Sequence, residues 1–305
     1  MAKGLLQPSD LTSDTYGKTH SAQCFLMFCY SWPFQLGEAI FLSACADTEI
    51  RTMNLEGNRV LITGGTSGIG LALAKEYVKH GSEVLITGRR DEMIEAARRE
   101  LPEAKCFKCD LREEQERMKL IEWAVTVAGG FNVLINNAGI QQELNFEAGV
   151  TSEEIEREIM TNLIAPMHLA SLAIPHLKMH PSSAIMNVTS GLGFMPLAIM
   201  PAYCASKAAM HSFSITLRHQ LRNTPVRVFE LIPGIVDTDL DKGARVRRGV
   251  TDFGISPEEC AHLAFESIAQ DQFEAPLGGA KFLVEASRSN FAEVFGRMNP
   301  IEARL

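Results

Sequence analysis

The sequence lacks the long hydrophobic runs, the excess of positive charge and the cysteine framework that mark several classes of protein. Its 305 residues carry 29 Lys and Arg against 37 Asp and Glu, a net charge of −8. Binding to nucleic acids or to anionic membranes needs a positive field, so neither partner is expected. The seven cysteines are odd in number and scattered, which favours a reducing, cytoplasmic location over a disulfide scaffold.

The first 52 residues show no steady helical or strand period. Two apolar patches, 24–34 and 39–46, are separated by polar residues, and a membrane span would need about 20 unbroken apolar residues. Some twenty mostly polar residues precede the first patch, which is a poor match to a signal peptide. We expect residues 1–52 to be a poorly ordered extension or a gene-model artefact. Residues 53–305 then have the size of one large α/β domain.

Short apolar runs alternate with stretches of helical period after Met53. The expected strands are 59–63, 83–87, 104–108, 133–136, 184–189 and 226–232, and the expected helices include 91–101, 152–177 and 202–222. Strands that alternate with helices of ten to twenty residues require right-handed crossovers between parallel strands. The sequence therefore predicts a single doubly wound parallel sheet with helices on both faces.

A glycine-rich turn joins the first expected strand to the first helix. It reads Thr63-Gly64-Gly65-Thr66-Ser67-Gly68-Ile69-Gly70. Gly64 permits the tight turn, Gly68 allows the backbone to approach a pyrophosphate, and Gly70 allows close packing of helix on strand. The free N–H groups at the helix start would then face the phosphate. The alternative is a purely structural turn, but the strand–turn–helix context favours a dinucleotide site.

The end of the second expected strand bears on the choice of nucleotide. An NAD site is expected to place Asp or Glu here for the ribose hydroxyls, and the sequence has Gly88 instead. Arg89 and Arg90 follow, and guanidinium groups fit the additional 2′-phosphate of NADP. The alternative is a solvated basic loop before a helix. We favour NADP over NAD.

Tyr203 and Lys207 stand four residues apart in an expected helix, so both side chains can point into one cleft. A nearby cation favours the phenolate and brings the pKa of a tyrosine towards working pH, as a general acid/base requires. Ser190 lies 13 residues before Tyr203, at the end of the fifth expected strand. Ligands bind at that edge of such sheets, and the Ser190 hydroxyl can donate to a substrate carbonyl there.

These motifs together resemble the short-chain dehydrogenase/reductase family. The set comprises 63–70, Asn136-Asn137-Ala138-Gly139, Asn162, Ser190, Tyr203, Lys207 and Pro233-Gly234, in the order typical of the family. The resemblance runs from Met53 nearly to Leu305 and implies a Rossmann-type fold. Within the family, residues 190–218 and 291–299 are similar to the DltE-type oxidoreductases.

The resemblance implies a role for each site residue. Tyr203 would be the catalytic acid/base, Lys207 would lower its pKa and hold the nicotinamide ribose, and Ser190 would orient the carbonyl. Asn162 would maintain a water-linked proton path to Lys207. The implied cofactor-binding residues are Gly64, Thr66, Ser67, Gly68, Ile69, Gly70, Arg89, Arg90, Asp110, Leu111, Asn137, Ala138, Gly139, Tyr203, Lys207, Pro233, Gly234, Ile235 and Thr238.

The function so implied is NADP-dependent hydride transfer between nicotinamide and a carbonyl or secondary alcohol of a small, largely apolar substrate. The alternative is a catalytically silent nucleotide-binding regulatory or scaffold protein of the same fold. No metal is expected, because the histidines are scattered. Family members commonly form homodimers or homotetramers. In segment 239–254, we expect Arg245, Arg247 and Arg248 to form a solvated face, with contact to an anionic substrate as the alternative.

Overall fold

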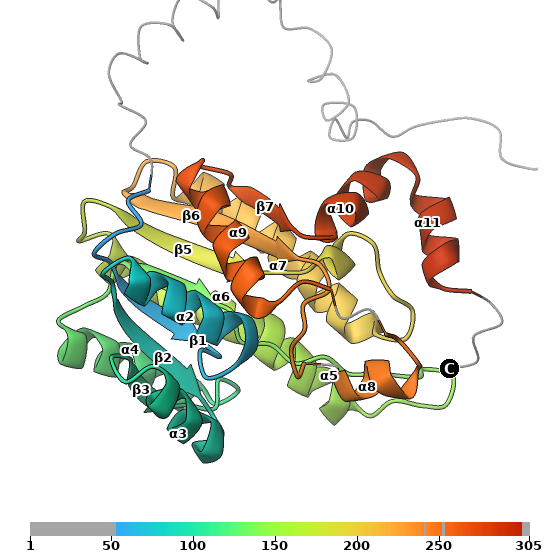
Figure 1. Cartoon of the computed structure of the whole chain (residues 1–305), viewed down its shortest axis with the longest axis horizontal. Coiled ribbons are helices and arrows are strands. Elements are labelled where there is room, and N and C mark those ends of the chain that lie inside the picture. Colours follow the sequence, from blue (N-terminus) through green and yellow to red (C-terminus); the bar gives the residue numbers. More distant parts are fainter. Residues whose placement is uncertain (1–52, 241, 252–253, 301–305) are drawn as a thin grey trace, which may run out of the picture. The chain divides into compact units, whose positions relative to one another are not determined.

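Seven parallel strands form one sheet in the order β3-β2-β1-β4-β5-β6-β7 (Figure 1). The computed structural model describes residues 53–240, 242–251 and 254–300, so the expectations for residues 1–52 lie outside the described part. The strands are β1 (Arg59–Thr63), β2 (Glu83–Gly88), β3 (Lys105–Lys108), β4 (Val133–Asn136), β5 (Ser183–Val188), β6 (Val226–Pro233) and β7 (Glu274–Leu277).

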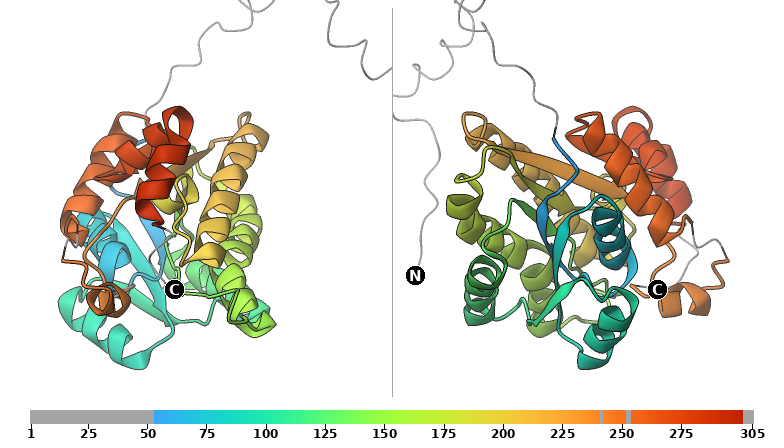
Figure 2. Two further views of the ribbon diagram at one scale, coloured as in Figure 1. Left: turned by 90° about the vertical axis from the view of Figure 1, so that its right-hand side faces the viewer. Right: turned by 60° about the vertical axis from the view of Figure 1, so that its left-hand side comes forward.

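Helices cover both faces of this sheet (Figures 1 and 2). They are α2 (Gly68–Lys79), α3 (Asp91–Glu100), α4 (Glu114–Ala128), α5 (Ser152–Ile159), α6 (Ala165–Leu177), α7 (Pro201–Gln220), α8 (Lys242–Arg247), α9 (Pro257–Ala269), α10 (Ala280–Ser289) and α11 (Phe291–Met298), with a π turn η1 (Met160–Ile164) and a 3-10 turn η2 (Gly191–Gly193). In the described part of the chain, no helix is long and apolar enough to cross a bilayer. The predicted doubly wound parallel sheet of Rossmann type is confirmed.

Strand alternation divides the core between the two faces. Val60 and Ile62 of β1 pack in one cluster with residues of α2, α3 and α9. Leu61 faces the other way and packs with residues of α4, α6 and α7. Successive strand residues point to opposite faces, so one apolar strand supplies both cores.

The order of the strands reverses at β1, which pairs with β2 on one side and β4 on the other. Ligands in such sheets bind where connections diverge in this way, at the carboxyl ends of the strands. Side chains join the two strand ends here. The Thr63 hydroxyl accepts hydrogen bonds from the backbone N–H of Asn137 (3.0 Å) and of Ala138 (3.1 Å), and Asn137 Nδ2 donates to the Thr63 carbonyl at 2.9 Å.

Two parts of the fold differ from the sequence-based prediction. The expected helix 152–177 is interrupted by η1, and an edge strand, β7, lies beside β6. The two C-terminal helices cover the segment after β5, where Met195 packs against Ala286 of α10 and Val294 of α11. Met195 therefore belongs to the core.

Candidate active site

The glycine turn between β1 and α2 has the geometry that a dinucleotide site needs. Gly64 has a φ of +63°, in the left-handed region that favours glycine. A Cβ on Gly70 would lie 2.4 Å from both the Gly64 carbonyl oxygen and Asn137 Nδ2, so only glycine fits where α2 passes the turn. The residues present thus form a cradle open to a phosphate group.

This turn opens onto a cleft of about 430 Å³ at the carboxyl edge of the sheet. The cleft is lined by most of the expected cofactor residues, namely Gly64, Thr66, Ser67, Gly68, Ile69, Arg89, Arg90, Asp110, Leu111, Asn137, Ala138, Gly139, Tyr203, Lys207, Pro233 and Thr238. Of that set, Gly70, Gly234 and Ile235 are not among its lining residues. The sequence did not single out Thr87, Cys109, Gln141, Thr161, Val188, Asp239 or Leu240, which also line it.

Tyr203 and Lys207 are both buried on one face of α7 at the end of this cleft. Lys207 Nζ lies 5.6 Å from the centroid of the Tyr203 ring and donates a hydrogen bond to the Val188 carbonyl at 2.8 Å. Burial lowers the pKa of Lys207 to about 8, against the opposing effect of the carboxylates of Glu158 and Glu230. The ammonium is therefore poised to exchange its proton near neutral pH.

Ser190 comes from a distant segment and lies against the same helix. It follows β5 and begins the turn η2, where its Oγ accepts the Leu192 N–H at 3.1 Å. Within this turn, a Cβ on Gly193 would approach the carbonyl carbon of Lys207 to 2.9 Å. This contact requires glycine, and it packs the turn that begins at Ser190 directly on the helix that carries Tyr203 and Lys207.

Asn162 connects the π turn to two other elements. Its Nδ2 donates to the Ile140 carbonyl at 2.8 Å and to Ser206 Oγ on α7 at 3.2 Å, and its Oδ1 accepts the Ile140 N–H at 2.9 Å. A Cβ on Gly139 would lie 3.4 Å from Asn162 Oδ1 and 3.6 Å from Lys207 Nζ. The structure therefore brings Asn162 and Lys207 together beside Gly139, in the short segment that follows β4.

The end of the cleft beside Gly88 is basic. A Cβ on Gly88 would lie 2.7 Å from Thr66 Oγ1, so an acidic side chain does not fit at this position without a shift. Arg89 and Arg90 are exposed beside it and line the cleft. The nearby Asp110 is held by Arg112 at 2.6 Å, a contact that lowers the pKa of Asp110.

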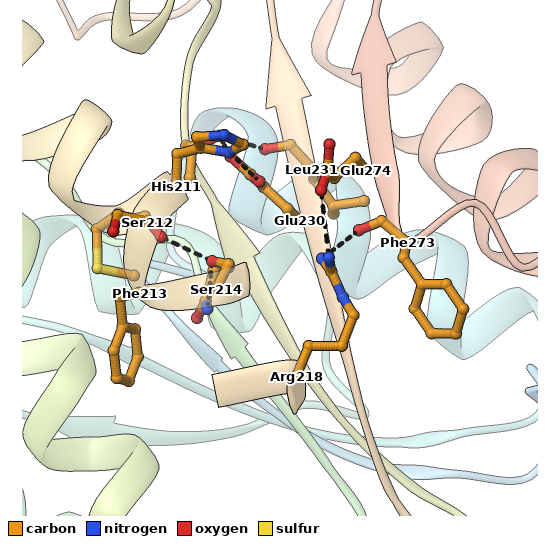
Figure 3. Close-up of polar contacts among 12 residues, drawn as sticks. His211, Ser212, Phe213, Ser214, Arg218, Glu230, Leu231, Phe273 and Glu274 are labelled. Carbon is orange, nitrogen blue, oxygen red and sulfur yellow. Dashed lines mark hydrogen bonds and ion pairs between the residues drawn. The ribbon is translucent and has the colours of Figure 1, made fainter. Parts of the chain in front are cut away.

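A buried carboxylate behind the site was not anticipated from the sequence. Glu230, on strand β6 between β5 and the edge strand β7, is fully buried and contacts His211 Nδ1 at 2.7 Å (Figure 3). Its other oxygen accepts the Thr189 hydroxyl at 2.7 Å. The signal was present in the sequence, because an acidic residue interrupts the otherwise apolar run VRVFELIP of that strand.

The arginines after β6 differ from the expected solvated face. Arg245 is buried and donates to the Val236 carbonyl at 3.2 Å, so the expectation is wrong for this residue. Arg247 and Arg248 both pair with Glu143, in the segment that follows β4. These ion pairs connect the end of α8 to the segment that follows β4. The described residues hold no cluster of His, Cys, Asp or Glu arranged to bind a metal.

Comparisons with known proteins decide the family. The model of the short chain dehydrogenase family matches residues 58–248. The uncharacterized oxidoreductase DltE of Bacillus subtilis (strain 168) is 43% identical over 251 residues, which cover 82% of this chain and 100% of that protein. The chain belongs to the short-chain dehydrogenase/reductase family. The resemblance to DltE-type oxidoreductases is thereby confirmed, and the protein is an oxidoreductase of a family that uses NAD or NADP.

Solved structures of short-chain dehydrogenases share the fold. A short chain dehydrogenase/reductase from Burkholderia phymatum in complex with NAD has a TM-score of 0.70 at 22% identity, covering 82% of this chain and 99% of that one. The closed form of serine dehydrogenase complexed with NADP+ has a TM-score of 0.64 at 25% identity, covering 72% and 92%. The two structures hold different nucleotides, so the fold alone does not set the choice between them.

Proposed function

We propose that this short-chain dehydrogenase/reductase is NADP-dependent and transfers a hydride between nicotinamide and a carbonyl or secondary alcohol, with Tyr203 as acid/base. The observation that carries the proposal is the burial of Tyr203 and Lys207 side by side at the end of the cleft, with Nζ 5.6 Å from the ring centroid. A buried cation next to a phenol stabilises the phenolate, the form that a tyrosine must reach during proton transfer.

Three side chains, those of Tyr203, Lys207 and Ser190, have different roles in the proposed reaction. The bound nicotinamide supplies or accepts the hydride. In the reducing direction the Tyr203 hydroxyl gives its proton to the substrate oxygen, and the Lys207 ammonium stabilises the phenolate that remains. The Ser190 hydroxyl donates a hydrogen bond to the same substrate oxygen and orients it. Alcohol oxidation uses the same groups in reverse.

The residues around the glycine turn would hold the cofactor. Gly64 and Gly70 shape the cradle for the pyrophosphate, and the start of α2 presents its N–H groups to it. Arg89 and Arg90 would bind the 2′-phosphate, which favours NADP over NAD. Support for this preference comes from Gly88, where an acidic side chain would fit only if the Thr66 side chain shifted. Asn162 would fix the segment at Ile140 and maintain the proton path to Lys207.

An apolar wall next to Tyr203 supports a largely apolar substrate. Met200, Tyr203 and Cys204 form a small buried cluster, and Leu192, Leu197 and Ile199 pack against it. Apolar packing around Tyr203 favours substrates whose reacting carbonyl is attached to hydrocarbon groups.

We also infer a cytoplasmic homodimer or homotetramer. Exposed apolar side chains on neighbouring elements support self-association, namely Ile164 at the end of η1, Met167 on α6 and Ile215 on α7. These residues offer an apolar face for a second copy of the chain. Light scattering of the purified protein would show the assembly, and a monomer would contradict this part of the proposal.

The alternative function is a catalytically silent nucleotide-binding scaffold. A measurement of turnover distinguishes it from the proposed enzyme. The test follows the loss of NADPH absorbance with a panel of ketones and aldehydes, for the wild type and for Tyr203→Phe. We expect turnover by the wild type, and for the variant a decrease of about a hundredfold or more in kcat with NADPH binding retained. Equal turnover of the two proteins would refute the role of Tyr203, and NADPH binding without any turnover would support the scaffold.

A further inference from the structure

We propose that Glu158 is a proton-relay residue that exchanges a proton with Lys207 through one water molecule held between the two side chains. This role rests on the proposed function, because it serves the turnover of Lys207 and Tyr203. Glu158 would act through Lys207 and would not touch substrate or cofactor, so it is a positioning residue of the site.

The surroundings of the Glu158 carboxyl group are the first support. Glu158 lies near the end of α5, four residues before Asn162, and its exposed fraction is 0%. One oxygen, Oε1, accepts the backbone N–H of Gln142 at 3.1 Å. The other, Oε2, is buried and has no hydrogen-bond partner among the described residues. Buried polar atoms nearly always have a partner, and an ordered water is the usual one where the protein supplies none.

The short segment that Glu158 holds, and that passes Lys207, is the second support. Asn162 forms hydrogen bonds with Ile140, and Glu158 accepts one from Gln142. The helical segment that contains Glu158 and Asn162 therefore fixes both ends of the stretch 140–142. Gly139, directly before that stretch, lies next to Lys207 Nζ. Glu158 and Lys207 are also close enough for the charge of each to shift the pKa of the other.

The charged and titratable groups near Glu158 come from two elements. Lys207 and Cys204 face it from α7, and Arg157 precedes it on α5. Burial raises the pKa of Glu158 to about 7, while burial lowers that of Lys207 to about 8. Two groups whose pKa values lie within about one unit exchange a proton at nearly balanced free energy. A donor and an acceptor matched in this way near neutral pH are what acid–base chemistry requires.

The proton balance of the relay is simple. In the reducing direction Tyr203 gives its phenolic proton to the substrate oxygen and takes one from the Lys207 ammonium. The resulting Lys207 amine takes the proton of the Glu158 carboxyl through the water, and solvent reprotonates the carboxylate between turnovers. In the oxidising direction each transfer reverses, and the proton finally leaves to solvent. No electrons move in the relay, because the electron pair travels only with the hydride.

The test compares Glu158→Gln with Glu153→Gln, a matched substitution on the exposed side of the same helix. Glutamine can still accept the Gln142 N–H but cannot exchange a proton. For the wild type we expect kcat of reduction to fall, and kcat of oxidation to rise, as the pH increases through about 7. In Glu158→Gln this dependence disappears, kcat falls about tenfold, and KM and NADPH affinity are unchanged. Glu153→Gln should behave as the wild type does.

Two further measurements keep the proposal falsifiable. Glu158→Asp retains a titratable carboxyl, so it should restore a pH-dependent limb if the relay is real. Infrared difference spectra between wild type and Glu158→Gln should show a carboxylic acid C=O band that disappears near pH 7, without any turnover. A band that disappears near pH 4.5, or an unchanged pH profile in Glu158→Gln, would overturn the relay alone. A wild type that turns over no carbonyl would refute the proposed function, and the relay with it.

Discussion

The carboxylate of Glu230 joins His211 on helix α7 to the end of strand β5, with His211 Nδ1 at 2.7 Å and the Thr189 hydroxyl at 2.7 Å. Thr189 directly precedes Ser190, and His211 lies one turn after Lys207. A single buried side chain therefore connects the two segments that carry the proposed catalytic groups. His211 also packs against the Phe194 ring at 4.4 Å, in the turn region after Ser190.

Replacement of His211 by Ala should destabilise the protein because it leaves Glu230 as an unpaired buried charge. We expect the free energy of unfolding to fall by roughly 2 kcal/mol, with partial recovery when Glu230→Gln is added. The hydrogen bond to Glu230 raises the pKa of His211 from its ordinary 6.5. Stabilisation by the charged pair is therefore complete below pH 6.5 and is lost as pH rises through the elevated pKa.

Urea unfolding at pH 6 and pH 9 checks this prediction, with His211→Asn as control. Asparagine keeps an N–H donor near the position of Nδ1 but has no charge. The difference between wild type and His211→Asn should be larger at pH 6 than at pH 9. A difference that does not vary with pH would show that the charge of His211 is unimportant.

The burial of Glu158 should make stability depend on pH in the opposite sense to an ordinary salt-bridged carboxylate. Its pKa rises from 4.5 in the unfolded chain to about 7 in the folded protein. The folded state binds more protons in that interval, so the free energy of unfolding falls as pH rises from 4.5 through 7, by up to about 3 kcal/mol. Glu158→Gln should lack this decrease, as measured by urea unfolding at pH 5 and pH 8. Parallel behaviour of the two proteins would contradict the elevated pKa.

Removal of the two cleft arginines tests the nucleotide preference. We expect the double variant Arg89→Ala/Arg90→Ala to bind NADPH more weakly. Each lost contact with the 2′-phosphate should weaken binding about tenfold, which corresponds to ~1.4 kcal/mol. Binding of NADH should be nearly unchanged. Arg99→Ala, an exposed arginine on α3, serves as the control. Titration of nucleotide fluorescence gives both affinities. If the wild type binds NADH more tightly than NADPH, the preference proposed for this site is wrong.

Two glycine-to-alanine substitutions should have opposite effects. Gly70→Ala places a Cβ 2.4 Å from the Gly64 carbonyl oxygen, and such overpacking costs about 1–3 kcal/mol. It should also weaken nucleotide binding, because it displaces the turn. Gly296 lies within α11, where an added Cβ would meet no neighbouring atom within 4 Å, so Gly296→Ala should stabilise the helix by about 0.5–1 kcal/mol. Thermal unfolding measures both, and a stabilising Gly70→Ala would contradict the close packing.

The sequence predicts the fold well where local pattern and tertiary structure agree. Short apolar runs and stretches of helical period indicate strands and helices whose ends the structure has within one or two residues. Strand β7 was not predicted, because it has only four residues and contains Pro276. Proline is tolerated in a strand at the edge of a sheet, where β7 lies.

Prediction of the candidate site was limited by contacts that span long distances in sequence. The spacing of Tyr203 and Lys207 is local, and their side-by-side position followed from the helix alone. Glu158 gave no such signal, because its burial depends on a contact with Gln142 in another segment. The burial of Arg245 likewise depends on the Val236 carbonyl. Neither partner lies within one helical turn of its residue.

The orientation of Asn162 depends on the number of residues in the π turn Met160–Ile164, which contains it. A π turn inserts one extra residue into a helix, and each residue rotates an α-helix by about 100°. Deletion of a single codon in this turn would restore regular winding in both flanking helices and swing Asn162 away from Ile140. We expect a protein with that deletion to lose the hydrogen bonds by which Asn162 holds Ile140 and Ser206.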